Sequence, residues 1–396
     1  MPRNYSFVFR REMSKLALKF VFAGDFATFV EMRVELTDEL SSASKVTVGS
    51  LFAGIGGFCS AYIRAGAQVS WANEIDAHAC RTYRANFKHP LLEKSIIDLS
   101  VEGDGLTPVD ILTAGFPCQP FSKAGNKLGF ADRRGQMFFE IIRLIEEFGA
   151  NKPKILFFEN VSNFKTHDNG RTFATVKEAV KGAGYWFSDA NAKILNTRLH
   201  SVIPQNRERI FMVAYSRDYF GTNNFVFPEP EPEANRKAVY DYLDLDTRAP
   251  DIHYFKESSQ YYPLFKDKID AGAEDGIYQL RRVYVRENKS NSCFTLTASM
   301  GLGGHNVPVI RDKWGIRRLT PKECANLQGF DTSSAEKWYT LPNDVADVQL
   351  YKQIGNAVTV SLVQKMAQIT IEDIANPQRK REEVNPALKA QLKFRF

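Results

Sequence analysis

The sequence predicts an α/β fold, in which a doubly wound parallel sheet with helices on both faces is joined to a smaller, β-rich domain. Between residues 45 and 224, short apolar runs alternate with segments of helical periodicity, which is typical of parallel βαβ units. Glycines at 54, 56 and 57 follow the first apolar run, where a doubly wound fold turns sharply from its first strand into a helix. A proline-rich stretch at 227–232 then ends the alternation, and we expect a domain boundary there.

The first domain is expected to contain five buried strands and four or more helices. The strands are short apolar runs, whereas the helices show a longer period and are often bounded by glycine. On these criteria the strands fall at 46–52, 68–74, 109–114, 154–159 and 209–215. The helices fall at 61–65, 75–86, 136–148 and 170–182.

The whole chain divides into four parts. Residues 1–45 form an N-terminal extension of unknown role, and 46–224 form the first domain. Residues 225–345 are rich in turns. The part 346–396 holds a helix, which we expect to return to the first domain, and a charged tail. Short strands are expected in the third part at 279–285, 293–298 and 307–310, and the returning helix at 358–374.

Composition narrows the classes of function. A chain of 396 residues with 44% hydrophobic residues can bury a sizeable core, and its net charge of +6 suits an anionic partner. Five scattered cysteines without zinc-ligand spacing indicate a reducing compartment and no bound metal. The most apolar early run, 16–30, is interrupted by Lys19 and Asp25, which argues against a membrane span or a secretion signal. We therefore expect a cytoplasmic protein.

Cys118 is the candidate nucleophile. It stands in the motif GFPCQPFS, residues 115–122, directly after an expected strand and between Pro117 and Pro120. A thiol on stiff backbone at the end of a parallel strand faces the crevice where such folds bind ligands. A cysteine can also be buried as a small hydrophobic residue, and the motif alone leaves that alternative open.

Three acidic side chains follow the glycine-rich turn. Glu74 and Asp76 come at the end of the second expected strand, where a doubly wound fold places an acid against a ribose. Asp98 comes later and could accept a hydrogen bond from an exocyclic amine. Simple loop polarity would explain Glu74 or Asp98 equally well when each is taken singly.

Glu159 closes an apolar strand, and its carboxylate is costly to bury unless it is paired or protonated. Arg207 and Arg209 stand two residues apart, hence on one side of a strand, and could neutralise Glu159 or contact a carbonyl oxygen. A surface ladder of ion pairs with Glu208 would also account for the two arginines.

Taken together, these motifs resemble those of the DNA cytosine-5 methyltransferases of bacterial restriction-modification systems. The resemblance covers residues 45–374 and depends on six motifs that stand in the family's order. They are FAGIGGF at 52–58, GFPCQPFS at 115–122, ENV at 159–161, QNRER at 205–209, RRLTPKECANLQGF at 317–330 and QIGNAV at 353–358. With all six present, a nucleophilic role for Cys118 is favoured over a buried one.

The resemblance implies that a methyl group passes from S-adenosylmethionine to carbon 5 of a cytosine that is flipped out of a specific duplex DNA sequence. Cys118 would add to carbon 6 and so make carbon 5 nucleophilic. Glu159 would hydrogen-bond the ring N3 and the exocyclic amine, Arg209 would bind the base carbonyl oxygen, and Arg207 would support Glu159. Because donation to N3 requires a proton, we predict a raised pKa for Glu159.

The resemblance also implies a Rossmann-like S-adenosylmethionine-dependent methyltransferase domain and a target recognition domain at 225–345. The glycine-rich segment 123–135 resembles the family's catalytic loop, which closes over DNA. The residues implied in cofactor binding are Phe52, Gly54, Ile55, Gly56, Gly57, Glu74, Ile75, Asp98, Leu99, Pro117, Met137, Asn356 and Val358. Those implied in DNA binding are Ser122, Lys123, Arg134, Thr295 and Leu296, with Arg281, Arg282, Arg286 and Lys289 as further candidates for phosphate or guanine contact.

The implied partners are duplex DNA and a restriction endonuclease that acts on the same site, and we expect a monomer. Two alternatives stay open. An RNA cytosine-5 methyltransferase is disfavoured by the long recognition segment. A catalytically silent DNA-binding relative is disfavoured by the presence of Cys118, Glu159 and Arg209.

Overall fold

The computed structural model describes the chain from residue 45 to 378, apart from short gaps. These gaps are 118–135, 224, 274, 282–283, 289–290, 301–305 and 334–337. The expected N-terminal extension, up to residue 44, and the tail from residue 379 lie outside the described residues. From Val46 onward the chain forms one compact unit, which is described below by itself.

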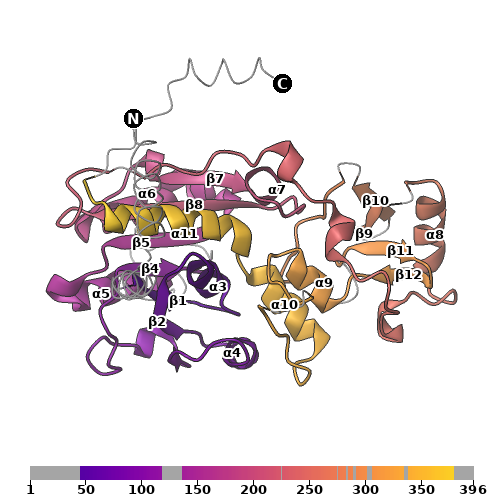
Figure 1. Ribbon diagram of the computed structural model, residues 1–396, viewed down its shortest axis with the longest axis horizontal. Coiled ribbons are helices and arrows are strands. Elements are labelled where there is room, and N and C mark those ends of the chain that lie inside the picture. The colour runs from indigo at the N-terminus through magenta and orange to yellow at the C-terminus, as the bar shows by residue number, and fades with distance from the viewer. Residues whose placement is uncertain are drawn as a thin grey trace, which may run out of the picture. The chain divides into compact units, whose positions relative to one another are not determined.

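An eight-stranded sheet lies in the left part of this unit in Figure 1. Its strands are β1 Thr47–Leu51, β2 Gln68–Asn73, β3 Leu91–Leu92, β4 Ile111–Ala114, β5 Ile155–Val161, β6 Tyr185–Trp186, β7 Ala192–Asn196 and β8 Glu208–Ser216. They follow the order β3-β2-β1-β4-β5-β8-β6, and β7 also pairs with β8. All the strands that we expected in the first domain are present.

The sheet is mixed, which corrects the expected parallel sheet. The strands from β3 to β5 pair in parallel, but β8 runs antiparallel to β5, β6 and β7. Only a short connection containing α7, Thr197–His200, separates β7 from β8, and short connections favour antiparallel pairing. The apolar run at 209–215 indicates that β8 is buried, but such a run carries no information on direction.

The winding of the chain reverses between β1 and β4. From β1 the chain proceeds outward to β2 and β3, whereas β4 lies on the other side of β1 and leads to β5. The carboxyl ends of β1 and β4 therefore border a crevice, and this is where doubly wound folds usually bind ligands.

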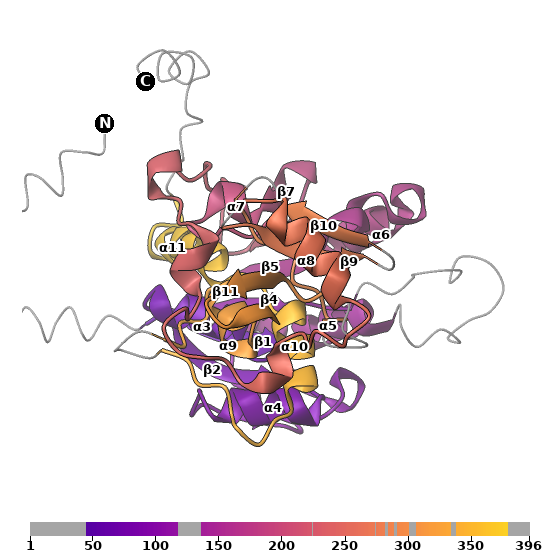
Figure 2. The same cartoon turned by 90° about the vertical axis from the view of Figure 1, so that its right-hand side faces the viewer.

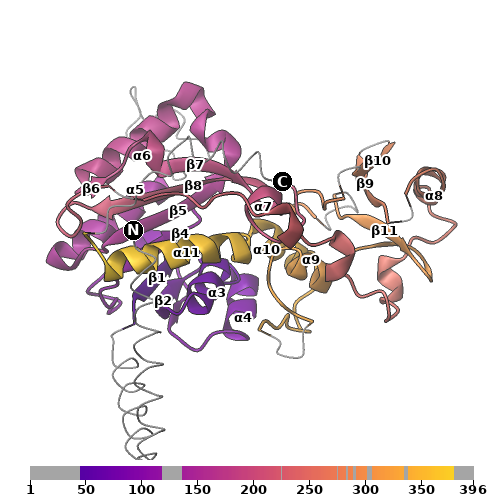
Figure 3. The ribbon, with the colours of Figure 1, turned by 45° about the horizontal axis from the view of Figure 1, so that its top comes forward.

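Helices cover both faces of the sheet (Figure 3). The core on one face includes residues of α3 and α11, which pack on each other, and the core on the other includes residues of α5 and α6. Along β5, Phe157 belongs to the first core and Phe158 to the second, so the strand is apolar on both sides. The helices that cover the two faces are α3 Gly57–Arg64, α4 Ala77–Arg84, α5 Gln136–Glu147, α6 Arg171–Gly182 and α11 Val360–Ala375. The last helix, α11, packs on α3 next to the sheet.

A second, four-stranded antiparallel sheet follows later in the chain (Figure 2). Its strands are β9 Ile277–Arg281, β10 Tyr284–Asn288, β11 Val309–Asp312 and β12 Gly315–Arg318, in the order β10-β9-β11-β12. Side chains of these strands pack in a small core with Phe265 and Ile269 of α8, Tyr262–Asp270.

Two expectations for this region are wrong. The strand expected at 279–285 is in fact parts of two strands, β9 and β10, which pair in antiparallel fashion, because an apolar run does not mark where one strand ends and the next begins. The strand expected at 293–298 is irregular, with a single bridge between Cys293 and Gln205.

Buried Arg317 connects the second sheet to the helices that follow it. Its guanidinium pairs with Asp312 at 2.6 Å and with both carboxylate oxygens of Glu323 at 2.8 Å. Glu323 lies in α9, Pro321–Asn326, which packs on α10, Asp347–Asn356. The remaining short helices are η1 Ile96–Asp98, η2 Gly149–Asn151, η3 Ser162–Lys165, η4 His167–Gly170, η5 Asp189–Asn191, η6 Glu233–Asn235, η7 Val239–Tyr242 and η8 Asp251–His253. Within the described part of the chain, no helix has the length and apolarity needed to cross a bilayer.

Candidate active site

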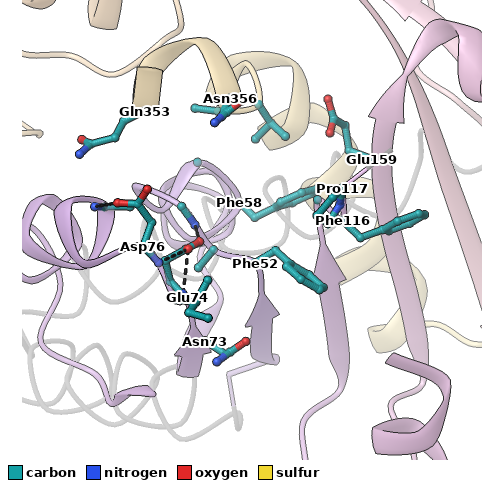
Figure 4. Close-up of a pocket in the computed structure, with 18 of the residues that line it drawn as sticks. Phe52, Phe58, Asn73, Glu74, Asp76, Phe116, Pro117, Glu159, Gln353 and Asn356 are labelled. Carbon is teal, nitrogen blue, oxygen red and sulfur yellow. Dashed lines mark hydrogen bonds between the residues drawn. The ribbon is translucent and has the colours of Figure 1, made fainter. Parts of the chain in front are cut away.

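A cavity of about 520 Å³ lies at the carboxyl ends of β1, β2, β4 and β5 (Figure 4). In Figure 4, Glu74 and Asp76 lie at one end of the site and Glu159 at the other, with Phe52 and Phe58 between them. The last turn of α10 and the residues after it form a further wall. A cavity of this size accommodates an organic ligand the size of a cofactor.

The loop after β1 follows an unusual backbone path. Phe52, Gly54 and Gly56 have positive φ angles of 51°, 56° and 84°. This conformation is unfavourable for Phe52, whose side chain lines the cavity. Gly57 is also required, because a Cβ atom there would lie 2.8 Å from Cγ2 of Val358. The glycines of the motif thus allow the start of α3 to approach the segment after α10 closely.

The Glu74 carboxylate organises this loop. Its Oε2 accepts a hydrogen bond from the N–H of Gly54, and its Oε1 accepts from the N–H groups of Ile75 and Asp76, each at 2.8 Å. A carboxylate accepts about four hydrogen bonds, so one position remains for a ligand hydroxyl. Asp76 in turn pairs with Lys352 of α10 at 2.8 Å, which links two walls of the cavity.

Most residues expected to bind the cofactor are brought together here. Ile55 and Gly56 shape the loop without lining the cavity, and Asp98 and Leu99 do not line it either. The chain reaches the cavity through Ser95 and Ile96 instead, and Leu99 is buried in the core that contains α5. Phe52, Gly54, Gly57, Glu74, Ile75, Pro117, Met137, Asn356 and Val358 line the cavity.

Sequence reasoning assigned no role to Ser95. Its side chain accepts from the N–H of Ile97 and caps η1. A serine three residues before an acid is a usual start of a helical turn, so the sequence could have indicated Ser95 as a helix cap. Because η1 starts at this cap, the residues that line the cavity, Ser95 and Ile96, come before Asp98 in the chain.

Glu159 and Arg209 form an ion pair at the other end of the cavity. Val161 pairs with Arg209 and Glu159 with Phe211, so Glu159 and Arg209 are diagonal neighbours on one face of the sheet. The distance from Arg209 Nε to Glu159 Oε1 is 3.1 Å, and the two side chains are 17% and 10% exposed. The sheet register therefore creates this pair.

Burial raises the pKa of Glu159 above its ordinary value and outweighs the opposing charges of Arg209 and Arg207. The direction predicted from the sequence is confirmed. A protonated carboxyl group can donate a hydrogen bond to a ring nitrogen, while Arg209 offers N–H donors to a neighbouring carbonyl oxygen.

Arg207 acts on Glu159 through its charge, whereas its hydrogen bonds go to backbone oxygens. Nη1 donates to the carbonyl of Leu296 at 2.6 Å, and Nη2 donates to those of Gly355 at 3.1 Å and Ala357 at 2.8 Å. The residue is 1% exposed, which excludes a surface ladder with Glu208. Arg207 therefore joins the start of β8, the segment around Leu296 and the turn after α10.

Cys118 lies outside the described residues, but the backbone that leads to it is held firmly. Phe116 is buried, and its ring packs edge-on against Phe158 and Phe164 with centroids 6.0 and 5.6 Å apart. The Phe116 carbonyl accepts a hydrogen bond from Asn160 Nδ2 at 3.0 Å. No role was assigned to Asn160 from the sequence, although an amide at the buried end of a strand must find partners.

Among the residues expected to contact DNA, the structure describes Thr295 and Leu296 as well as Arg281 and Arg286. The Thr295 hydroxyl donates to the carbonyl of Asn206 at 2.5 Å, and the Leu296 N–H donates to Gln205 Oε1 at 3.1 Å. Leu296 is wholly buried, so its side chain anchors the segment, whereas Thr295 lines a second cavity. Ser122, Lys123, Arg134, Arg282 and Lys289 lie outside the described residues.

The described ranges contain no group of three or more His, Cys, Asp or Glu residues placed to hold a metal ion.

Comparisons with known proteins agree on one family. A family model described as C-5 cytosine-specific DNA methylase matches residues 46–372. Type II methyltransferase M.Bsp6I of Bacillus sp. (strain RFL6) is 42% identical over 325 residues, which cover 81% of this chain and 97% of the relative. M.HhaI of Haemophilus parahaemolyticus is 34% identical over 335 residues, covering 80% and 91%. The solved structure of the S. pombe Dnmt2 methyltransferase shares the fold, with a TM-score of 0.63 at 21% identity over 83% of this chain and 99% of that chain.

Proposed function

The chain belongs to the C-5 cytosine-specific DNA methylases, and we propose that Cys118, Glu159 and Arg209 carry their reaction in this protein. It is a DNA cytosine-5 methyltransferase that uses S-adenosylmethionine and acts on duplex DNA. The assignment of residues depends on one observation, the continuity of a single cavity from Glu74 to Glu159. A methyl donor and an acceptor base must lie in contact for direct transfer, and one continuous cavity supports this.

The residues at the Glu74 end fit S-adenosylmethionine. Glu74 retains an acceptor position for a ribose hydroxyl, and Ile75, which is 65% exposed, offers apolar surface to an adenine ring. Phe52 and Val358 add apolar walls. When bound, S-adenosylmethionine supplies an electrophilic methyl group.

At the Glu159 end, the chain's residues activate the base. The Cys118 thiolate adds to carbon 6 of cytosine, and the displaced electron pair makes carbon 5 nucleophilic. Glu159 gives its proton to N3, and Arg209 donates hydrogen bonds to the carbonyl oxygen, so both stabilise the developing charge. After methylation, carbon 5 loses its proton to solvent, the carbon–sulfur bond breaks, and N3 returns its proton to Glu159. The thiolate is thereby regenerated.

We also propose that two parts of the chain form two domains with different roles. Residues 225–345, which contain the four-stranded sheet, form the target recognition domain, and residues 46–224 together with the segment after 345 form the catalytic domain. The named relatives are type II methyltransferases, which supports a role in restriction-modification beside an endonuclease for the same site. We infer a monomer that acts in the cytoplasm, where a bacterial chromosome is accessible.

The test is to express the protein in a host without DNA methylation and to sequence its DNA after bisulfite conversion. We expect 5-methylcytosine within one short sequence and none with Cys118→Ala. Purified protein should also transfer labelled methyl groups to duplex DNA rather than to transfer RNA. Transfer to RNA alone, or activity retained by Cys118→Ala, would refute the proposal.

A further inference from the structure

The hairpin of β9 and β10 presents a polar face to a second cavity. Tyr278, Leu280 and Val285 belong to the small core that contains α8, and the strand period of two puts their neighbours on the opposite face. That face borders a cavity of about 250 Å³. It is lined by Gln279, Arg281, Arg286, Phe294, Thr295, Thr297, Ser299 and Asn306.

Arg286 is held in a defined orientation in this cavity. Its guanidinium carbon lies 4.4 Å from the centroid of the Phe294 ring, a cation–π contact. Its Nη2 donates to Oε1 of Gln279, the residue opposite it in the hairpin, at 3.3 Å. Gln279 is 3% exposed and donates in turn to the carbonyl of Asn306 at 3.1 Å. A side chain oriented in this way loses little conformational entropy when it binds a ligand.

Within the described residues, no ion pair neutralises the charge of Arg286. Two other arginines of the same sheet are ion-paired, Arg311 with Asp270 at 2.6 Å and Arg317 with Asp312 at 2.6 Å. Among the described residues, no carboxylate lies within 4.0 Å of Arg286, although the side chain carries five N–H donors. An uncompensated and oriented guanidinium at a polar cavity suits an acceptor pair on a ligand.

This cavity is close to the catalytic end of the first one. Thr295 lines it and is hydrogen-bonded to Asn206, three residues before Arg209. Thr295 thus links the second cavity to the segment that carries Arg209, so we expect a base read there to lie near the target cytosine in the same duplex.

We propose that Arg286 reads a guanine of the target sequence through the major groove, and that Phe294 and Gln279 position its guanidinium. Guanine presents N7 and O6 as adjacent acceptors, and a guanidinium matches them with two N–H groups. This rests on the proposed function, because it requires duplex DNA whose cytosine occupies the site of Glu159. Arg281 lines the same cavity and is exposed like Arg286, and we assign to it a contact to phosphate.

The test uses the full-length protein and its own target, identified by sequencing methylated DNA. Each guanine of a target duplex is replaced in turn by 7-deazaguanine, which lacks the N7 acceptor, and kcat/KM is measured. For the wild type we expect a loss of roughly 5- to 150-fold at one guanine within a few base pairs of the cytosine. Arg286→Ala should show no further loss there, because alanine retains no donor for N7.

Two variants serve as controls. Arg311→Ala removes one positive charge from the same sheet outside the cavity and should keep the wild-type sequence preference. Arg281→Ala should weaken binding to all duplexes alike and reduce its salt dependence by about one phosphate contact.

The possible outcomes distinguish a failure of the role given to Arg286 from a failure of the proposed function. If the wild type methylates its target but tolerates 7-deazaguanine at every position, Arg286 reads no guanine and the proposed function stands. The same holds if Arg286→Ala discriminates among bases as the wild type does. If Arg286→Ala does not fold, the wild-type series alone decides. If the wild type methylates no duplex, the proposed function and the inference fall together.

Discussion

Replacing Arg207 by lysine tests whether this buried guanidinium holds three parts of the site together. Lysine keeps the positive charge, but its single nitrogen cannot reach the carbonyls of Leu296, Gly355 and Ala357 at once. A hydrogen bond to a charged group is worth about 1.5–3 kcal/mol, and the Ala357 carbonyl keeps a second donor in Gln328. Lysine therefore loses two of the three hydrogen bonds, and Gln328 partly compensates for the one to Ala357. We expect the free energy of unfolding to fall by about 2–4 kcal/mol.

The same variant should bind S-adenosylhomocysteine more weakly, because Gly355 and Ala357 flank Asn356 in the cavity wall. Urea denaturation measures the first effect and isothermal titration calorimetry the second. The matched control is Arg248→Lys, which alters an arginine that is 52% exposed and pairs with Asp251, and it should change stability by less than about 0.5 kcal/mol. If Arg207→Lys matched this control in both measurements, the structural role given to Arg207 would be wrong.

Three further predictions concern the catalytic end of the cavity. Cys118→Ala should bind S-adenosylhomocysteine as the wild type does but form no denaturation-resistant adduct with a 5-fluorocytosine duplex; an adduct would refute the assignment of the nucleophile. Because the pKa of Glu159 is raised in the folded protein, its contribution to stability is complete at low pH and declines as the pH rises through that pKa. Glu159→Gln should lack this decline, so the two curves of unfolding free energy against pH must not run parallel. Asn160→Ala leaves the buried carbonyl of Phe116 without its donor, which costs about 1–3 kcal/mol. It should also lower kcat, because Phe116 stands two residues before Cys118, and an unchanged kcat would contradict this.

The elements around the site could be predicted because their sequence patterns are local. A strand buried on both faces is a short apolar run, as in β4 and β5, and the turn after β1 needs glycine where φ is positive. Glu74 and Glu159 could be found for the same reason, since a carboxylate at the end of such a strand is costly unless it has a use.

What could not be predicted depends on distant parts of the chain. The antiparallel direction of β8 follows from its connection and not from its composition. Arg207 donates hydrogen bonds to backbone oxygens at residues 296, 355 and 357. Because every residue has a backbone carbonyl, no sequence pattern could identify these three acceptors. Asp98 was favoured over Ser95 because an acid is the more conspicuous partner for an amine, whereas the actual approach to the cavity depends on the start of η1.

The position of α10 and α11 at the end of the chain has a consequence for biosynthesis. Asn356 and Val358 line the cavity, and α11 packs on α3, yet more than a hundred residues, including the whole second sheet, are translated between β8 and these segments. Glu159 and Arg209 are therefore synthesised well before the residues at 352–358, which form one wall of the cavity. Long-range contacts of this kind form late in folding. A nascent chain stalled before residue 352 would hold the reactive groups without a complete pocket for the methyl donor, so cytosine methylation requires translation past residue 358.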